Sequence, residues 1–243
     1  MNILVTNDDG IESQGLQALA HRLTREGDVT VFAPSADFSG SSAAIGPIGE
    51  GLPDVVEAAH DGFGDVRAAY HLDGPPALAT LLACCGLFGT VPDIVVAGIN
   101  RGWNVGRAVH FSGTVGACVA AAGFGLPAIA VSQVAATVGD EQRWASAADA
   151  AAGYIGQAIA HGRVLNVNVP NRRREEFAGA LETTPADRLP YALHSPTLTR
   201  ISDGRFAVRV EHAGPFERPD GSDVVAVERG YVSVTVLSPT HAG

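Results

Sequence analysis

The sequence predicts an α/β fold with a doubly wound, mostly parallel sheet and a C-terminal β-hairpin extension. Short apolar runs rich in Val and Ile alternate with segments of helical spacing over the first two-thirds of the 243 residues. Hydrophobic residues make up 46% of the chain and charged residues 17%, enough apolar material for one large domain. Residues 231–237 alternate apolar and polar side chains, which is typical of a strand near the C-terminus.

Each expected strand of the parallel sheet is a short apolar run that ends at a turn residue or a polar cluster. The expected strands are residues 2–6, 28–33, 93–98, 127–132 and 164–169. Residues 35–42 are small and polar, which indicates a loop after the second strand. Residues 46–72 give no clear pattern beyond weak strand signals at 55–58 and 66–72.

The expected helices lie between these strands. Leu16, Leu19 and Leu23 recur at helical spacing in the first helix, and Gly27 follows its end. Pro75 and Pro76 suit the first turn of the second helix. The predicted helices span residues 15–25, 77–88, 112–122 and 140–161. Strands that run in the same direction through such helices form a right-handed, doubly wound sheet.

The pattern changes after Pro170. Residues 171–176 form a charged run, 206–211 and 231–237 read as strands, and 217–223 form a polar loop. We therefore divide the chain into a catalytic core, 1–170, and an extension, 171–243. The extension is too small to bury a core alone, so we expect it to pack on the main sheet or to exchange with a second subunit.

The overall charge restricts the partners. A formal net charge of -10 disfavours nucleic-acid polymers and anionic membranes, because both bind cationic surfaces. Three cysteines without metal or redox spacing predict buried free thiols. No signal peptide precedes the first strand, and the apolar stretches are too short to span a membrane. We expect a cytoplasmic protein.

Asp8 and Asp9 follow the first strand directly, where parallel α/β sheets bind ligands. Two adjacent carboxylates repel each other unless a cation lies between them. Oxygen ligands favour Mg²⁺ or Mn²⁺ over zinc. The alternative is a solvated turn with a helix N-cap.

Further polar clusters follow other strands, and a parallel sheet gathers its strand ends at one edge. Ser39 and Asn100 supply a hydroxyl and an amide oxygen, so with Asp8 and Asp9 they offer four oxygen ligands to a divalent metal. Residues 112–114, Ser-Gly-Thr, open a helix and predict a phosphate cradle of hydroxyls and free backbone N–H groups. The alternative for these three residues is an ordinary N-cap.

These segments resemble the survival protein SurE family of metal-dependent nucleotidases and phosphomonoesterases. The resemblance covers nearly the whole chain, and no single short motif carries it. The matching stretches are 3–10, 33–34 with 39–40, 92–100 followed by Gly102 and Asn104, 112–115, 125–132, 165–170 and 230–235.

The resemblance implies a Rossmann-like, three-layer fold and a set of site residues. Its C-terminal extension would form a homodimer or homotetramer. The implied metal ligands are Asp8, Asp9, Ser39 and Asn100. The implied phosphate-binding residues are Asn104, Ser112, Gly113 and Thr114.

The chain departs from the family pattern around the expected pocket. Arg107-Ala108 replaces an acidic position, and His110-Phe111 precedes Ser-Gly-Thr where Tyr is usual. Leu78 replaces a carboxylate and Asp37 stands where neutral or basic residues are common. Arg107 and His110 are therefore candidates for substrate choice through a second anionic group, and the alternative is an exposed loop position for both.

The predicted reaction is metal-dependent hydrolysis of a small phosphate monoester, most simply a nucleoside 5'- or 3'-monophosphate. Asp8 and Asp9 are the candidate catalytic residues. The attacking group is either a metal-activated water or Asp8, and Asp8 is also a candidate general base. The alternatives are a phosphatase for a sugar or cyclitol phosphate and a metal- and nucleotide-binding protein without turnover.

Overall fold

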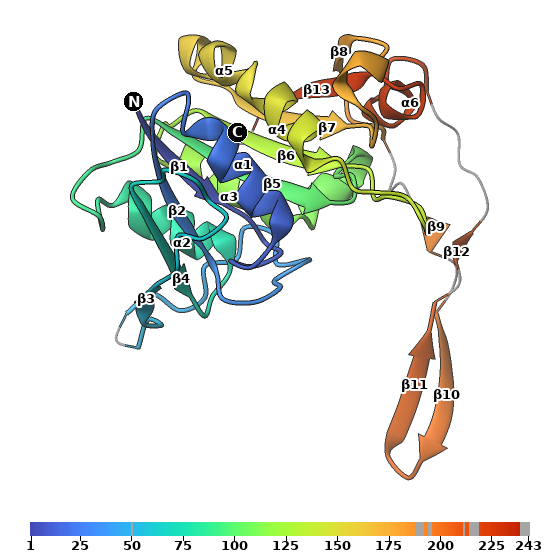
Figure 1. Ribbon diagram of the computed structural model, residues 1–243. Helices are drawn as coiled ribbons and strands as arrows, with labels where there is room; N and C mark the ends of the chain where they lie inside the picture. Colours follow the sequence, from blue (N-terminus) through green and yellow to red (C-terminus); the bar gives the residue numbers. More distant parts are fainter. Residues whose placement is uncertain (50, 188–191, 194–195, 211, 214–218, 239–243) are drawn as a thin grey trace.

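The computed structural model describes residues 1–49, 51–187, 192–193, 196–210, 212–213 and 219–238. A nine-stranded sheet crosses the main body of the molecule in the order β3-β4-β2-β1-β5-β6-β7-β13-β8 (Figure 1). Its pairs are parallel except β3 with β4 and β13 with β7. The strands are β1 (Asn2–Thr6), β2 (Asp28–Pro34), β3 (Val55–Glu57), β4 (Ala68–Leu72), β5 (Ile94–Arg101), β6 (Ala128–Gln133), β7 (Val164–Val169), β8 (Ala180–Thr183) and β13 (Val232–Leu237).

The strands alternate their side chains between two apolar layers. Ile3 and Val5 of β1 point into one layer and Leu4 into the other, as the two-residue period of a strand requires. The first layer packs under α1 (Gln14–Leu23), α4 (Trp144–Ala152) and α5 (Ile155–His161). The second packs under α2 (Pro76–Cys84) and α3 (Gly113–Gly123). The predicted three-layer, mostly parallel α/β fold is confirmed.

Two predicted helices differ from the structure in length. The predicted helix over 140–161 is wrong, because it is two helices separated at Gly153 and Tyr154, with α4 beginning only at Trp144. Gly is a poor helix former, and Gln142 holds the segment before α4 by donating to Gln133 and to the Val134 carbonyl. The helix predicted to Phe88 ends at Cys84.

After Pro170 the predicted strand over 231–237 is confirmed as β13, and the segment also supplies elements that the sequence reading did not identify. β13 runs antiparallel to β7, and β8 then extends the sheet parallel to β13. A short helix, α6 (Asp223–Glu228), begins at the last residue of the predicted polar loop because Ser222 caps its N-terminus. A 3-10 turn, η2 (Arg174–Glu176), lies in the charged run. The division of the chain at residue 170 stays a prediction.

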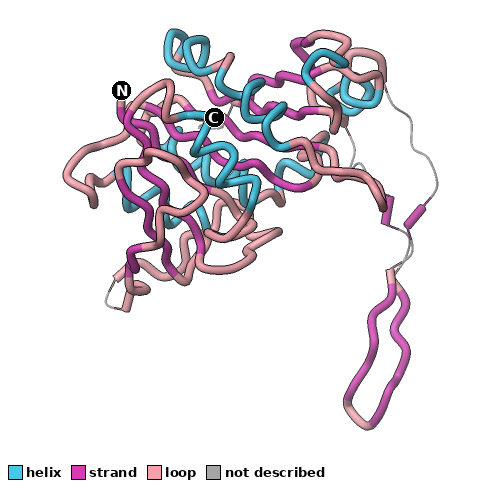
Figure 2. The backbone as a smooth tube through the Cα atoms, in the orientation of Figure 1, coloured by secondary structure: helices cyan, strands magenta, loops and turns pink. Residues whose placement is uncertain are grey.

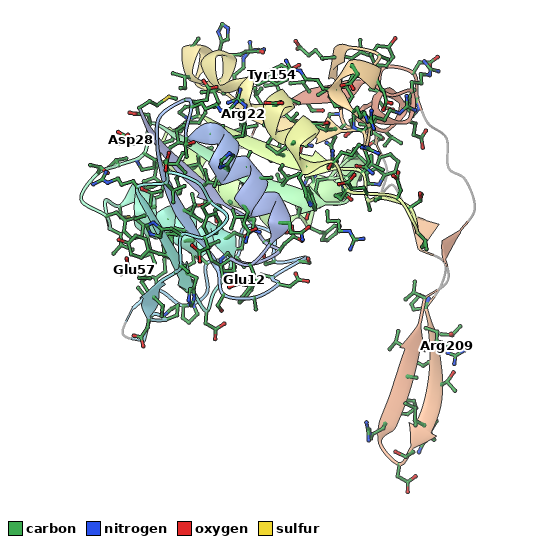
Figure 3. The ribbon with its side chains drawn as sticks, in the orientation of Figure 1. Glu12, Arg22, Asp28, Glu57, Tyr154 and Arg209 are labelled. Carbon is green, nitrogen blue, oxygen red and sulfur yellow. The ribbon has the colours of Figure 1, made fainter. Side chains whose placement is uncertain are left out.

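An antiparallel hairpin projects away from the body (Figures 1 and 2). It consists of β10 (Thr197–Ser202) and β11 (Arg205–Arg209), and Arg209 lies on it far from the sheet (Figure 3). A short pair, β9 (Ala192–Leu193) with β12 (His212–Ala213), lies between the hairpin and the body. The predicted strand over 206–211 therefore begins at Arg205 and ends at Arg209.

Two further expectations concern cysteines and membrane spans. Cys84 and Cys118 are buried free thiols as predicted, whereas Cys85 is exposed because it follows the last residue of α2 on the outer side. Within the described part of the chain, no helix is both long and apolar enough to cross a bilayer.

Candidate active site

The first turn after β1 places two carboxylates at the carboxyl edge of the sheet. Asn7 closes this turn by donating its Nδ2 to the Gly10 carbonyl at 2.9 Å. Gly10 has a φ of +96° and lies against the backbone of Ala36, so a side chain would strain the turn and crowd the next loop. Asp8 and Asp9 are therefore fixed between β1 and the loop after β2.

Asp8 is the more buried carboxylate, with only 3% of its surface exposed. Its Oδ1 accepts a hydrogen bond from the Thr114 hydroxyl, and the backbone N–H of Thr114 also donates to it. Burial raises the pKa of Asp8, the hydrogen bonds from Thr114 oppose that rise, and the negative charge of Asp37 adds to it. Thr114 thus holds Asp8 against the start of α3.

Asp9 is the second carboxylate of this turn. Burial raises its pKa to about 6, and the charges of Asp8 and Asp37 act in the same direction. The backbone N–H and the guanidinium of Arg101 oppose the shift. Asp9 Oδ2 is buried, yet it has no hydrogen-bond partner among the described residues. A buried acceptor without a donor is costly, so this oxygen suits a cation.

The loop after β2 presents three serines in different surroundings. Ser39 is exposed, and its backbone N–H donates to Asp37 Oδ1 at 2.7 Å. Ser42 donates its hydroxyl to the His110 carbonyl at 2.8 Å. Ser41 lies between them, with a buried Oγ that has no partner among the described residues. The sequence reading selected Ser39 and missed Ser41, although both belong to the same polar cluster.

The last residues of β5 and the loop after it bring two asparagines, Asn100 and Asn104, to the same edge. Asn100 is half-buried, and its Nδ2 donates to the Gly102 carbonyl at 3.1 Å, so its amide oxygen is the atom that could bind a cation. Asn104 is more deeply engaged, since its Nδ2 donates to Ser132 Oγ and its backbone bonds Asn166 and Asn168. These contacts fix the loop beside the site.

The N-terminus of α3 lies directly against Asp8. Ser112 caps the helix, because its Oγ accepts the Val115 N–H at 3.1 Å. There is no room for a side chain at position 113. A Cβ added to Gly113 would lie 2.7 Å from Ser41 Oγ and 2.9 Å from Asp8 Oδ2. Ser41 and Asp8 therefore pack directly against the backbone of the first turn of α3.

Arg107 and His110 lie on a 3-10 turn, η1 (Gly106–His110), at the margin of the site. Both are exposed, and Arg107 forms an ion pair with Asp187 at 2.5 Å. In the described part of the chain, neither side chain forms a hydrogen bond or ion pair with Asp8 or Asp9. The geometry therefore brings together Asp8, Asp9, Gly113 and Thr114, with Arg107 and His110 outside this group.

Asp223 is a second buried carboxylate that the sequence reading did not single out. Its oxygens accept the N–H groups of Gly106, Ala186 and Val224 at 2.7, 3.0 and 2.8 Å. Burial still raises the pKa of Asp223, and these three donors oppose the rise. Asp223 thus connects η1 to the segment around Ala186. In the sequence it belongs to the predicted polar loop over 217–223, and nothing else distinguished it.

The donor set at the acidic edge fits a hard divalent cation. Asp8 and Asp9 lie in the turn after β1, Asn100 lies near the end of the neighbouring strand β5, and the buried Asp9 Oδ2 has no partner among the described residues. Over the described residues, no three His, Cys, Asp or Glu side chains cluster closely enough to bind a metal without further ligands. Neutral oxygen atoms must therefore complete the coordination, which favours Mg²⁺ or Mn²⁺ over softer metals.

Comparison with known proteins gives consistent matches over the chain. The family model described as Survival protein SurE matches residues 3–191. A protein named 5'-nucleotidase SurE from Geobacter metallireducens is 35% identical over 98% of this chain and 91% of its own length. One of the same name from Aeromonas hydrophila subsp. hydrophila is 34% identical over 98% and 92%. The crystal structure of the SurE protein from Aquifex aeolicus superposes with a TM-score of 0.81 at 28% identity, covering 100% of this chain and 95% of that one.

Proposed function

Because the chain belongs to the survival protein SurE family, we propose that it is a phosphoric monoester hydrolase that depends on a divalent metal. The observation that carries this proposal is the pair Asp8 and Asp9 at the carboxyl edge of the sheet, with an unsatisfied oxygen on Asp9. A dication there would allow an acidic protein to bind an anionic ester.

We propose Asp8, Asp9, Ser39 and Asn100 as ligands of Mg²⁺ or Mn²⁺. When bound, such an ion neutralises phosphate charge and lowers the pKa of a water molecule. Thr114 holds Asp8 in place through its hydroxyl and its backbone N–H.

The N-terminus of α3 at Ser112, Gly113 and Thr114 faces the same carboxylates, so it suits the phosphoryl oxygens. Asn104 holds the adjoining loop in place, because its carbonyl accepts hydrogen bonds from Asn166 and Asn168.

We place water, not Asp8, as the attacking group. Asp8 is 3% exposed and one of its oxygens already accepts from Thr114, so its carboxylate is held in one orientation. Attack by Asp8 on phosphorus would leave a phosphoaspartate. Acid quench during turnover, followed by mass spectrometry, should find Asp8 unmodified, and a phosphorylated Asp8 would reverse this assignment.

The proposed substrates are nucleoside 5'- and 3'-monophosphates, on the basis of relatives named 5'-nucleotidase SurE. No finding favours a sugar or cyclitol phosphatase or a binder without turnover. Phosphate release should be measured with nucleotides, sugar phosphates and an aryl phosphate, each with Mg²⁺, Mn²⁺ or a chelator. We expect nucleotides to be hydrolysed fastest and chelator to stop the reaction. Sugar phosphates as the best substrates, or turnover in chelator, would contradict the proposal.

We also propose that the hairpin β10–β11 forms a homodimer or homotetramer. One face of the hairpin carries three exposed apolar side chains, with Leu198 70% exposed, Val208 63% and Phe206 50%. Such a surface is suited to burial against a second copy. Sedimentation of the full chain should give a dimer or tetramer, and replacement of residues 197–209 by a short linker should give a monomer. A monomeric full chain would refute this.

A further inference from the structure

A cleft of about 290 Å³ lies at the carboxyl ends of β6 and β7. Its walls come from the residues that follow these two strands, from the end of α6, and from Trp103 in the loop after β5. The carboxyl ends of parallel strands are where α/β sheets bind ligands. The cleft is therefore on the same edge of the sheet as Asp8 and Asp9.

The backbone on both sides of Trp103 is fixed to the sheet. The Gly102 N–H donates to the Gln133 carbonyl at the end of β6, at 2.8 Å. The Asn104 N–H donates to Asn168 Oδ1 of β7, also at 2.8 Å. Trp103 is thus held at the wall of the cleft by bonds to the two strands that lead into it.

Trp103 is half-buried. It packs against a small apolar cluster of Val105, Ala186 and Val224, which supports the ring. The same residue lines the cleft, so the part of the ring that is not packed is available to a ligand. A supported indole ring is well suited to stack on a flat aromatic group.

The lining of the cleft restricts its occupant. Asp140, Glu228 and Arg172 give it one more carboxylate than guanidinium, so a second phosphate is disfavoured there. Val134 and Pro170 add apolar surface. A neutral ring with an apolar face and polar edges fits this lining, and a nucleobase has that chemistry.

The cleft is close enough to the acidic edge to serve the same ligand. Trp103 follows the proposed metal ligand Asn100 by three residues, which span at most about 11 Å. β5 lies between β1, which leads to Asp8 and Asp9, and β6. Neighbouring strands are about 4.8 Å apart, so β6 is about 10 Å from β1. A ligand with its phosphate at the acidic edge can therefore extend its other end into the cleft.

We propose that the cleft beside Trp103 binds a nucleobase, that of the nucleotide substrate, with the indole ring stacked on the base. This inference rests on the proposed function and adds a specificity-determining residue to it. It also gives the extension a part in substrate binding, because Val227 and Glu228 of α6 line the cleft.

The first test compares a nucleotide with a phosphate ester that has no base. Hydrolysis of adenosine 5'-monophosphate (AMP) and of glycerol phosphate by the full chain is measured with Mn²⁺. Trp103→Ala should raise the KM for AMP about 5- to 150-fold, the range of one base–aromatic stack. Its kcat for AMP and its kcat/KM for glycerol phosphate should change less than about twofold. Trp103→Phe, which keeps an aromatic ring, should restore most of the affinity.

Two further variants separate the base contact from the fold. Trp144→Phe is the matched control, because Trp144 begins α4 and does not line this cleft, and its KM for AMP should stay near that of the wild type. Ala135→Leu narrows the cleft without changing Trp103, and should also raise the KM for AMP but not for glycerol phosphate. Thermal unfolding of each variant checks that the fold is kept.

Fluorescence tests the same contact without turnover. The chain has 2 tryptophans, so Trp144→Phe leaves Trp103 as the sole tryptophan emitter. Adenosine, which has no phosphate, should quench this emission to saturation, and glycerol phosphate should not.

Several outcomes would overturn the inference. An unchanged KM for AMP in Trp103→Ala would remove the cleft from the substrate site, and equal losses for AMP and glycerol phosphate would mean that Trp103 only supports the fold. Absence of quenching by adenosine would also contradict it. If the wild type hydrolyses no nucleotide but adenosine quenches Trp103, the proposed function fails while the base site stands.

Discussion

Asp8 and Asp9 at the sheet edge contrast with Asp223 at the junction with the extension. Burial raises the pKa of all three carboxyl groups. Asp223 nevertheless receives three backbone N–H donors on its two oxygens, whereas Asp9 retains a buried oxygen without a donor. The difference indicates that Asp223 holds η1 in place, and it supports our proposal that Asp8 and Asp9 bind a cation. Burial alone would not distinguish them.

The largest expected effect is a loss of phosphatase activity when Asp8 is replaced. Asp8→Asn should lower kcat/KM for a phosphate monoester by about a thousandfold or more, because it removes the anion that holds the metal. Its stability should be retained, since it also removes a buried charge. Steady-state kinetics and thermal unfolding measure both. Asp37→Asn changes an exposed carboxylate and should cost far less activity; comparable losses in the two variants would contradict the assignment.

Replacement of Asp223 should instead lower the stability of the fold. Asp223→Ala leaves the N–H groups of Gly106, Ala186 and Val224 without their acceptor, so the free energy of unfolding should fall by about 3 kcal/mol. Urea denaturation gives this value. Stability within error of the wild type would show that water replaces the carboxylate without cost.

Metal binding at Asp8 and Asp9 should stabilise the folded protein. Mn²⁺ at about 100 times its Kd should raise the free energy of unfolding by about 2.7 kcal/mol. Asp9→Asn should largely lose this gain, while Asp223→Asn should keep it. Urea denaturation with and without Mn²⁺ provides the comparison, and an equal gain in Asp9→Asn would remove Asp9 from the ligand set.

In the metal-free protein, the raised pKa of Asp9 should make the free energy of unfolding depend on pH. The folded pKa of about 6 lies above the ordinary value of 3.8, so the folded state binds the extra proton between these values. The Asp9 contribution therefore favours folding at low pH and is lost as pH rises from about 4 to about 6. Asp9→Asn should flatten this part of the stability curve, measured in chelator, and an unchanged slope would assign it to other groups.

The smallest effect is expected outside both regions. Arg107 and Asp187 form an exposed ion pair, and such pairs contribute roughly 0–1 kcal/mol. Arg107→Ala should therefore change the urea midpoint only slightly. A loss as large as that of Asp223→Ala would mean that Arg107 also anchors η1.

The sequence predicted the elements whose signals are local. Runs such as 2–6 and 164–169 are short, mostly apolar segments that form buried strands, and their bounds agree with β1 and β7. The two-helix break at Gly153 and the strand β8 were missed, because the first interrupts a good helical pattern and the second depends on pairing with β13. Non-local pairing leaves little trace in a local pattern.

The candidate site shows the same limit. Asp8 and Asp9 stood out because they follow a strand directly, and the approach of Ser112–Thr114 to them followed from the sheet-edge rule. Ser41 and Ser39 are alike in the sequence, and only the loop ties at Phe38 and Ser42 make one hydroxyl buried. Asp223 was missed because its three donors come from three separate segments.

The late insertion of β13 into the sheet has a consequence for synthesis. Among the described strands, β8 pairs only with β13, which follows it by about fifty residues. A growing chain on the ribosome therefore exposes β8, and the outer edge of β7, until β13 has been synthesised. Unpaired strand edges promote aggregation. Chains released early by premature stop codons before Val232 should accumulate in inclusion bodies, whereas the full-length product should not.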